Sequence, residues 1–213
     1  MATRTTSNPS PTRDAAPESG RDRILRVAAE LFLANGYAET SLRTIADAVD
    51  MRPASIYHHF ESKDALLANI LDIGMDAVTS AFDATAERLS PGSPGGRELL
   101  EAHVAAHLRA LFTHHAFTAA HVTVFPFVPA QVRRDAVGRR DAYEAQWTQL
   151  LTEAVPSLSA DARRLTRLAL FGAMNSAVQW FDPTEGSVDE LANALVSTLW
   201  NGLGSLSKES SSA

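Results

Sequence analysis

The chain's seven histidines are the residues whose types and spacing first suggest chemistry. His58 and His59 stand side by side in the segment "IYHHF", next to Tyr57. This trio could supply metal ligands or a proton-transfer pair, or it could have no chemical role. Among the other five, His103 and His107 have the i, i+4 spacing of metal ligands on one helix face, and His121 or His114 could add to them. No HExxH pattern accompanies them, so we favour histidines that line a pocket or lie half-exposed at a helix end.

Catalytic chemistry finds little support in the sequence. Serine, histidine and aspartate are all present, but no nucleophile elbow, P-loop or GxGxxG motif surrounds them. The chain contains no cysteine, which excludes thiolate nucleophiles, disulfides and cysteine-based zinc sites. We therefore predict a protein that is not an enzyme and that needs no cofactor.

Aromatic residues gather in the second half of the chain and suggest a small-molecule pocket. Polar side chains are interleaved with them and could provide the few directional contacts that such a site uses. The alternative is that aromatics at helical spacing form a core. The predicted ligand-binding residues are His103, His107, Phe112, His121, Phe125, Trp147, Asn175, Gln179 and Trp180.

The bulk composition restricts the class of protein that must carry these residues. The chain has 213 residues and a net charge of −6, which argues against a protein that coats nucleic acid non-specifically. Its first twenty residues lack the apolar run of a signal peptide, and no later segment has eighteen uninterrupted apolar residues. We expect a cytoplasmic protein without a membrane partner.

Helical periodicity begins near Ser19 and no convincing alternating strand is present, so we predict an all-α fold. Short helices are expected to start at Thr40 or Ser41 and at Pro53, and a longer one at Ser62. After the breaker "SPGSPGG", helices are expected over about 97–115, 117–125, 131–155, 160–182 and 187–206.

Four parts of the chain follow from this organisation. Residues 1–18 are predicted to be a disordered arm and residues 207–213 a disordered tail. Residues 19–67 are predicted to form a three-helix helix-turn-helix DNA-binding domain, and residues 68–206 a helical ligand-binding and dimerisation domain.

Two short helices joined by a tight turn, and buttressed by a preceding helix, are typical of a helix-turn-helix. The second helix must enter a DNA major groove, so small or polar residues are needed near its start, and "RPAS" (Arg52–Ser55) meets this need. Hydroxyls and cations near helix starts can hold phosphates. The residues so placed are Thr40, Ser41, Thr44 and Lys63.

The segment Thr40–Leu67, "TSLRTIADAVDMRPASIYHHFESKDALL", resembles the signature of the TetR family of transcriptional repressors. The matching features are the Thr-Ser pair, the later Ile-Ala pair, the run "IYHHF", and Ser62-Lys63. With the preceding "AAELFLANGY", the resemblance covers about residues 21–71. It implies an N-terminal DNA-binding domain, a variable helical ligand domain, and a homodimer formed by the last two helices.

Carried onto this sequence, the resemblance gives Tyr57 as a phosphate contact and places His58 and Lys63 near the DNA backbone. The predicted DNA contacts are Thr40, Ser41, Arg43, Thr44, Arg52, Pro53, Ala54, Ser55, Tyr57, His58 and Lys63. Two residues depart from the family pattern. Asp50 replaces the usual turn glycine, although aspartate tolerates the left-handed conformation. Arg52 replaces the usual Ser or Thr cap, so the operator sequence does not carry over.

The effector is predicted to be a small hydrophobic or acyl-CoA-type molecule. The run Trp180-Phe181-x-Pro183 resembles the tail of TetR-type regulators that sense fatty-acyl or steroid-derived acyl-CoA. Two double-arginine steps within residues 133–147 could clamp an anionic head group. The alternative is a solvated helix face whose arginines pair with its own Asp135 and Asp141.

These features together predict a ligand-responsive repressor that binds a palindromic double-stranded DNA operator as a homodimer. Small residues around Gly172 and an apolar stripe from Val188 to Leu199 would form the dimer contact. Effector binding would shift the long helix after Ser62, with Gly74 as a soft point. The alternative from another class is a helical small-molecule binding protein whose DNA-reading function is lost.

Overall fold

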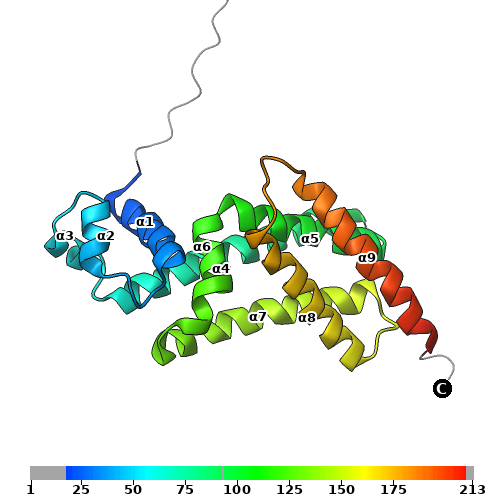
Figure 1. Ribbon diagram of the computed structural model, residues 1–213. Coiled ribbons are helices and arrows are strands. Elements are labelled where there is room, and N and C mark those ends of the chain that lie inside the picture. Colours follow the sequence, from blue (N-terminus) through cyan, green and yellow to red (C-terminus); the bar gives the residue numbers. More distant parts are fainter. Residues whose placement is uncertain (1–17, 93, 210–213) are drawn as a thin grey trace, which may run out of the picture.

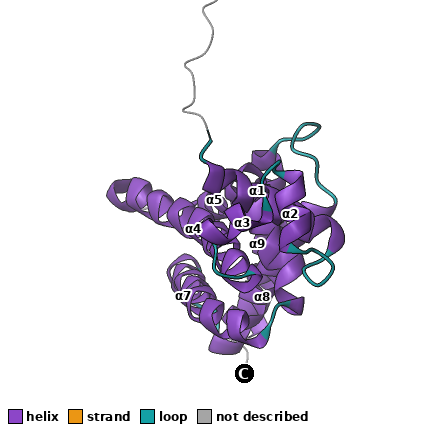
Figure 2. Ribbon diagram, turned by 90° about the vertical axis from the view of Figure 1, so that its left-hand side faces the viewer, coloured by secondary structure: helices purple, strands orange, loops and turns teal. Residues whose placement is uncertain are grey.

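The chain is all-α, as predicted, and contains no strand within residues 18–92 and 94–209, the part that this computed structural model describes (Figures 1 and 2). Its α-helices are α1 (Gly20–Asn35), α2 (Leu42–Ala48), α3 (Pro53–His59), α4 (Lys63–Leu89), α5 (Gly96–Thr113), α6 (His115–Ala119), α7 (Ala130–Ala154), α8 (Ala160–Ser176) and α9 (Val188–Glu209). The predicted arm and tail lie outside the described residues, except for residue 18 and residues 207–209. The last three belong to α9, which therefore continues past its predicted end at 206.

The first three helices form a head at one end of the molecule, at the left of Figure 1. Local capping chemistry defines where α1, α2 and α4 begin. The hydroxyls of Ser19, Ser41 and Ser62 each accept a hydrogen bond from the backbone N–H three residues on, at 3.0–3.1 Å. The turn between α2 and α3 holds Asp50 at φ 53°, the left-handed conformation that its short polar side chain tolerates.

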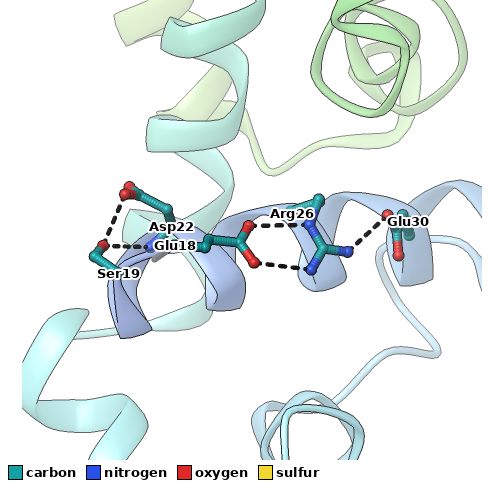
Figure 3. Close-up of polar contacts among 5 residues, drawn as sticks. All are labelled: Glu18, Ser19, Asp22, Arg26 and Glu30. Carbon is teal, nitrogen blue, oxygen red and sulfur yellow. Dashed lines mark hydrogen bonds and ion pairs between the residues drawn. The ribbon is translucent and has the colours of Figure 1, made fainter. Parts of the chain in front are cut away.

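The start of α1 is fixed by an arginine network that Figure 3 shows in close-up. The Arg26 guanidinium donates two hydrogen bonds to the Glu18 carboxylate, at 3.0 and 3.1 Å, and one to Glu30 at 3.2 Å. The hydrogen bonds from Arg26 hold the pKa of the Glu18 carboxyl below its usual range. These side chains are 40–53% exposed, so the network ties Glu18, two residues before α1, to the helix and adds little to stability.

A buried apolar core holds the head together. Phe32 of α1, Ile45 of α2 and Ile56 of α3 are at most 1% exposed within it. Residues from much later in the chain complete this core: Ala120, Val124, Phe125, Val128 and Val132. The head is therefore packed directly against the segment that follows α6.

Helix α4 connects the head with a second core. Its first half supplies buried leucines and isoleucine to the head, and its second half supplies Met75, Val78 and Phe82 to the second core. Among the described residues, α4 alone is long and apolar enough to cross a membrane by length and composition. In the apolar stretch of α4 that meets this test, 44% of the residues are buried inside the protein.

Gly74 marks a close approach between α4 and α6. A Cβ atom added at this buried glycine would lie 2.5 Å from the carbonyl oxygen of Phe117 and 3.2 Å from the backbone N of Thr118. Glycine is needed here because the two backbones pass too closely for any side chain. Close packing, rather than a soft point in the helix, explains this residue.

The second core fills the space among α4, α5, α7, α8 and α9. Trp147 of α7 is fully buried at its centre, with ring centroids 5.5 Å from Phe82 and 5.6 Å from Phe171. Edge-to-face pairs of this kind add to the energy of apolar burial. This aromatic cluster includes the candidate ligand residues His103, His107 and Trp147.

Two predicted helices differ from the observed ones. The helix expected over 117–125 is replaced by the end of α6, a π-helical turn at Ala120–Val124 and a 3-10 turn at Phe125–Phe127. Pro126 lacks the N–H that would continue an α-helix, which accounts for the break. The helix expected over 160–182 ends at Ser176 and tightens into a 3-10 turn, Ala177–Gln179.

Candidate functional site

The tip of the head is formed by the start of α3 and the exposed side of α2. Arg52–Ala54 are exposed at the N-terminus of α3, Ser55 is half-buried behind them, and Arg52 makes no capping hydrogen bond. Arg43 and Thr44 are exposed on α2, which packs against α3. This surface presents two cations and two helix N-termini, a combination suited to phosphate oxygens and base edges.

The segment "IYHHF" divides between core and surface. Ile56 is fully buried and Phe60 is 3% exposed, so both anchor α3 in the head. Tyr57 is 59% exposed, and His58 and His59 are exposed at the end of the same helix. No group of three or more potential metal ligands occurs in the described residues. The segment therefore presents a phenol and two imidazoles to solvent from a fixed helix.

Thr40 does not lie on this surface, although it is one of the predicted DNA contacts. It is 1% exposed, and its hydroxyl donates to the carbonyl oxygens of Gly36 at 2.9 Å and Leu31 at 3.3 Å. Ser41 is exposed, but its hydroxyl caps α2 and lies 2.8 Å from the hydroxyl of Thr44. Thr40 is a structural residue, because its side chain binds carbonyls at the end of α1 and in the loop that follows it.

Lys63 also turns inward. Its ammonium donates to the carbonyl oxygens of Tyr37 and Thr40, each at 2.9 Å, and lies 4.2 Å from the centroid of the Tyr37 ring. The hydroxyl of Tyr37 donates to the Asp64 carboxylate, and burial raises the pKa of the Tyr37 hydroxyl. The ammonium is thus engaged by the loop between α1 and α2. A phosphate contact predicted for Lys63 would have to compete with these bonds.

A cavity of about 240 Å³ lies among α4, α5, α6, the π turn, α7 and α8. Its lining is Gly74, Met75, Val78, His107, Leu111, Thr118, His121, Val122, Arg140, Tyr143, Glu144, Phe171 and Asn175. Apolar side chains form much of this wall. The polar groups include an ion pair between Arg140 and Glu144, 3.4 Å apart. An apolar cavity with a few convergent polar groups is the usual form of a small-molecule site.

His107 contributes a buried imidazole to this cavity. Its Nδ1 lies 2.8 Å from the Tyr143 hydroxyl, and its Nε2 is buried without a hydrogen-bond partner. Burial lowers the pKa of His107 to about 4, opposed by the nearby Asn175 amide. The ring is therefore neutral at pH 7, and the His107 side chain and the Asn175 amide lie together in the cavity wall.

His121 has a tautomer that its surroundings determine. Its Nε2 lies 2.6 Å from the carbonyl oxygen of Leu71, which can only accept, so Nε2 carries the proton. Burial lowers the pKa of this ring and keeps it neutral. Its buried Nδ1 then has a lone pair and no partner. The cavity thus contains a hydrogen-bond acceptor that suits a hydroxyl or N–H group of a ligand.

His107, His121 and Asn175 are the predicted ligand residues that line this cavity. His103 lines a different one, at the far end of α4. Arg140, Tyr143 and other lining residues were missed by the sequence-based prediction. The only sequence signal for Arg140 was the double-arginine step, because helical periodicity marks a buried face without saying what that face surrounds.

The other predicted ligand residues are placed elsewhere. Phe125 belongs to the core of the head, Trp147 to the second core, and Phe112 packs against Phe181 at a centroid distance of 5.4 Å. Gln179 is exposed and Trp180 is 60% exposed. The early end of α8 explains why Gln179 and Trp180 are exposed. If α8 continued to residue 182 as predicted, these two side chains would point in other directions.

Among the described residues, no ion pair joins an arginine of α7 to Asp135 or Asp141, as one interpretation expected; Arg140 pairs instead with Glu144 of the same helix. Arg139 forms ion pairs with Asp72, at 3.1 Å, and with Asp76, both on α4. Arg140 lies 5.2 Å from the centroid of the Phe125 ring. These contacts tie α7 to α4 and to the core of the head, and only Arg140 reaches the cavity lining.

An exposed helix-turn-helix joined to a cavity-bearing helical domain defines a DNA-binding regulator with a separate ligand-binding domain. Comparison with known families agrees. Residues 24–70 match the family described as bacterial regulatory proteins, tetR family. Residues 93–203, more than half of the chain, match the family described as tetracyclin repressor-like, C-terminal domain. The chain belongs to the TetR family of transcriptional regulators.

Individual relatives extend over nearly the whole chain. The HTH-type transcriptional repressor KstR2 of Rhodococcus jostii is 29% identical over 203 residues, covering 92% of this chain and 98% of the relative. The structure of the TetR family regulator PfmR from Thermus thermophilus is 26% identical, covers 85% of this chain and 95% of its own, and has a TM-score of 0.72. The structure of the ketosteroid transcriptional regulator KstR2 of Mycobacterium tuberculosis, 20% identical with a TM-score of 0.71, shares the fold and covers 86% and 94%. These relatives are transcriptional regulators, which are not enzymes.

Proposed function

We propose that this protein is a homodimeric repressor that binds a palindromic DNA operator and is released by a small hydrophobic or acyl-CoA-type effector. The observation that carries the proposal is the shared wall between the head and the cavity. His121 lines the cavity, while Ala120 and Val124, on the same π turn, are buried in the core of the head. A ligand that moves this turn would therefore move the head, including the DNA-recognition helix α3.

The operator contacts are proposed to come from the exposed tip of the head. They are Ser41, Arg43, Thr44, Arg52, Pro53, Ala54, Ser55, Tyr57 and His58. Thr40 and Lys63 would act indirectly, by holding the loop before α2. Because arginine and hydroxyl contacts to phosphate dominate such complexes, the affinity should fall steeply as salt rises.

The dimer is proposed to form through α8 and α9. Leu165 and Leu168 of α8 are 61% and 45% exposed, and Gly172 continues the same helix face. Trp180, 60% exposed, follows the 3-10 turn Ala177–Gln179 at the end of this helix. A second copy of the chain would bury these apolar side chains in a four-helix bundle. Two-fold symmetry of the protein would then impose an inverted repeat on the operator.

The effector proposal combines the cavity with its charged edge. The volume of about 240 Å³ lies near the lower limit of small-molecule sites, about 300 Å³, so it suits an acyl or ring portion rather than a whole acyl-CoA. Arg140 lines the cavity, and Arg167 pairs with the same Glu144 carboxylate that Arg140 contacts. An anionic group could replace this carboxylate between the two guanidinium groups. The KstR2 structure of Mycobacterium tuberculosis is described as a ketosteroid transcriptional regulator, and a repressor of the same name matches nearly the whole chain, which favours a steroid-type ring portion.

Thermal-shift measurement with the full chain tests this effector. A panel of fatty-acyl and steroid-derived acyl-CoA compounds should stabilise the protein by about 2.7 kcal/mol at a hundredfold excess over Kd. Free coenzyme A should do little, and Arg140→Ala should reduce the shift of the acyl-CoA compounds. No shift with any acyl-CoA, together with a shift caused by unrelated hydrophobic drugs, would contradict the proposal.

The rival function is a helical small-molecule binding protein that no longer reads DNA. Its support in the sequence was the unusual pair Asp50 and Arg52. Asp50 adopts the left-handed turn conformation, and Arg52 leaves α3 intact behind Pro53. We therefore favour the DNA-binding regulator, and a DNA-binding selection separates the two.

A further inference from the structure

A second and larger cavity, of about 510 Å³, lies at the end of α4 that is remote from the head. It is formed by the last turns of α4 and α7 and the first turns of α5. Its lining is Phe82, Ala86, Leu89, Ser90, Pro94, Gly96, Leu99, His103, Gln146, Gln149, Leu150 and Glu153. None of these residues lines the effector cavity, and the rings of Phe82 and Tyr143, with centroids 5.9 Å apart, lie between the two.

His103 gives this cavity a buried acceptor. The residue is 1% exposed, and its Nδ1 lies 2.8 Å from the carbonyl oxygen of Leu99. Since a carbonyl can only accept, Nδ1 carries the proton and Nε2 has a lone pair. Nε2 is buried and has no hydrogen-bond partner. Burial also lowers the pKa of His103, which keeps the ring neutral at pH 7.

Gln146 gives the cavity a second acceptor from another helix. Its amide nitrogen donates to the carboxylate of Asp83 at 2.9 Å, which fixes the orientation of the amide group. Its Oε1 is then directed away from Asp83, buried and without a partner. Two unsatisfied acceptors on α5 and α7 thus belong to the same cavity, and each costs free energy unless a donor reaches it.

The electrostatics of the cavity favour a positive charge. Glu153 adds a carboxylate, whose Oε1 accepts a hydrogen bond from Gln149 at 2.9 Å, and no Lys or Arg occurs among the described lining residues. The C-terminal turns of α4 and α7 bring the negative ends of two helix dipoles, opposed by the first turn of α5. Arg88, an exposed residue of α4 outside the lining, partly opposes this negative potential, because its positive charge lowers the pKa of His103.

We propose that this cavity is a second ligand site that binds a small amphipathic organic amine. The ammonium group would donate to His103 Nε2, Gln146 Oε1 and the Glu153 carboxylate. The apolar body would lie against Phe82 and the leucines of the lining. Water could satisfy the orphaned acceptors, but it would leave this apolar wall and most of the volume unused.

Isothermal titration of the full-length protein with three amines, 2-phenylethylamine, tryptamine and hexylamine, tests the proposal without any DNA. At least one amine should bind with a Kd below about 1 mM, the range of a small ligand making a few good contacts. The neutral 2-phenylethanol should bind more weakly, and phenylacetate weakest of all. Failure of all three amines, or phenylacetate binding as tightly as 2-phenylethylamine, would overturn the proposal.

Variants locate the site. Gln146→Met keeps the side-chain length and should weaken amine binding at least about fivefold, since it removes one charge-assisted hydrogen bond. Asn175→Leu, a matched change in the effector cavity, should leave amine affinity within about twofold. Loss of amine binding in Asn175→Leu but not in Gln146→Met would assign the amine to the effector cavity and refute a second site.

A spectroscopic readout covers the case in which a variant misfolds. In the wild-type protein, the ¹⁵N resonance of His103 Nε2 should lie at the position of an unprotonated nitrogen. It should shift when 2-phenylethylamine is added, while that of His121 Nδ1 stays in place. Amine binding without any change at His103 would contradict the assigned contact. This readout is independent of operator and effector binding, so its failure is separate from that of the repressor proposal.

Discussion

Replacement of Gly74 by alanine tests the close crossing of α4 and α6. The new Cβ would lie 2.5 Å from the Phe117 carbonyl oxygen, roughly 1 Å nearer than an ordinary contact between non-bonded atoms. The obstructing atoms are backbone, so no side-chain rotation relieves them and the two helices must separate. Overpacking of this kind costs about 1–3 kcal/mol. Alanine recovers up to about 1 kcal/mol of helix propensity, which only partly offsets the clash.

We expect Gly74→Ala to lower the stability by about 2 kcal/mol, because a clash at the severe end of that range, about 3 kcal/mol, is offset by up to about 1 kcal/mol of helix propensity. For a chain of this size the loss corresponds to a decrease in Tm of about 4–8 °C. Thermal unfolding monitored by circular dichroism measures it, with all variants at equal protomer concentration.

Gly138→Ala is the matched control. Gly138 is an exposed residue inside α7, and a Cβ added there would meet no atom within 4 Å. This substitution should raise the stability by about 0.5–1 kcal/mol, since it removes only the entropic cost of a helical glycine. If Gly74→Ala behaves like Gly138→Ala, α4 and α6 do not pass as closely as described, and the shared wall between cavity and head loses its basis.

Three further perturbations separate the roles of individual side chains. Tyr57→Phe should weaken binding to all operator variants by about 1 kcal/mol and leave the Tm unchanged, because it removes one exposed hydroxyl. Fluorescence anisotropy measures the DNA affinity, and a lowered Tm would refute a surface role for Tyr57. Lys63→Met should lower the stability by about 1–2 kcal/mol, seen as a lower Tm, because it loses its bonds to the loop carbonyls. Arg43→Met should weaken DNA binding and leave the Tm unchanged, and the opposite pattern would reverse these assignments. His107 has a pKa of about 4 in the folded protein and about 6.5 in the unfolded chain. Between these pH values the unfolded chain binds more protons than the folded protein does. The stability must therefore fall as the pH decreases from 7 to 5, by up to about 2 kcal/mol. Urea denaturation should show a smaller decrease for His107→Gln, and an equal decrease would exclude His107 as its source.

Local chemistry made much of the head predictable. Ser41 and Ser62 cap α2 and α4 because their hydroxyls accept a backbone N–H three residues on, and Pro53 fixes the first turn of α3. These helix starts therefore do not depend on distant residues. The left-handed turn at Asp50 follows from the same short-range physics. Together with the spacing of buried Ile56 and Phe60, these signals place α3 correctly before any tertiary contact is known.

The direction in which a polar side chain points was less predictable. Thr40 and Lys63 stand beside helix starts in the sequence, as phosphate-binding residues do, yet both satisfy carbonyls of the loop after α1. Whether such a side chain binds a loop carbonyl or a phosphate depends on where that loop lies, and the position of a loop is set by tertiary contacts. Phe125 shows the same limit, because its ring joins the core of a head about 60 residues earlier in the chain.

The ligand cavity was predicted only in part for a related reason. His107, His121 and Asn175 combine polar atoms with an apolar surrounding, and this contrast is visible in the sequence. Trp180 gave the same signal, but it follows a 3-10 turn that ends α8 early and carries the ring to the surface. Aromatic periodicity therefore locates buried helix faces, while helix ends decide which residues remain on them.

Selection of binding sites from random DNA duplexes by the full-length protein tests the central claim most directly. The account predicts that the selected duplexes share one inverted repeat, with two half-sites matched to the two heads of a dimer. Affinity for that sequence should fall by several orders of magnitude between low and physiological salt, as expected for a protein that makes several phosphate contacts. A selection that enriches no common sequence, or only a site without two-fold symmetry, would contradict a dimeric, operator-binding TetR regulator.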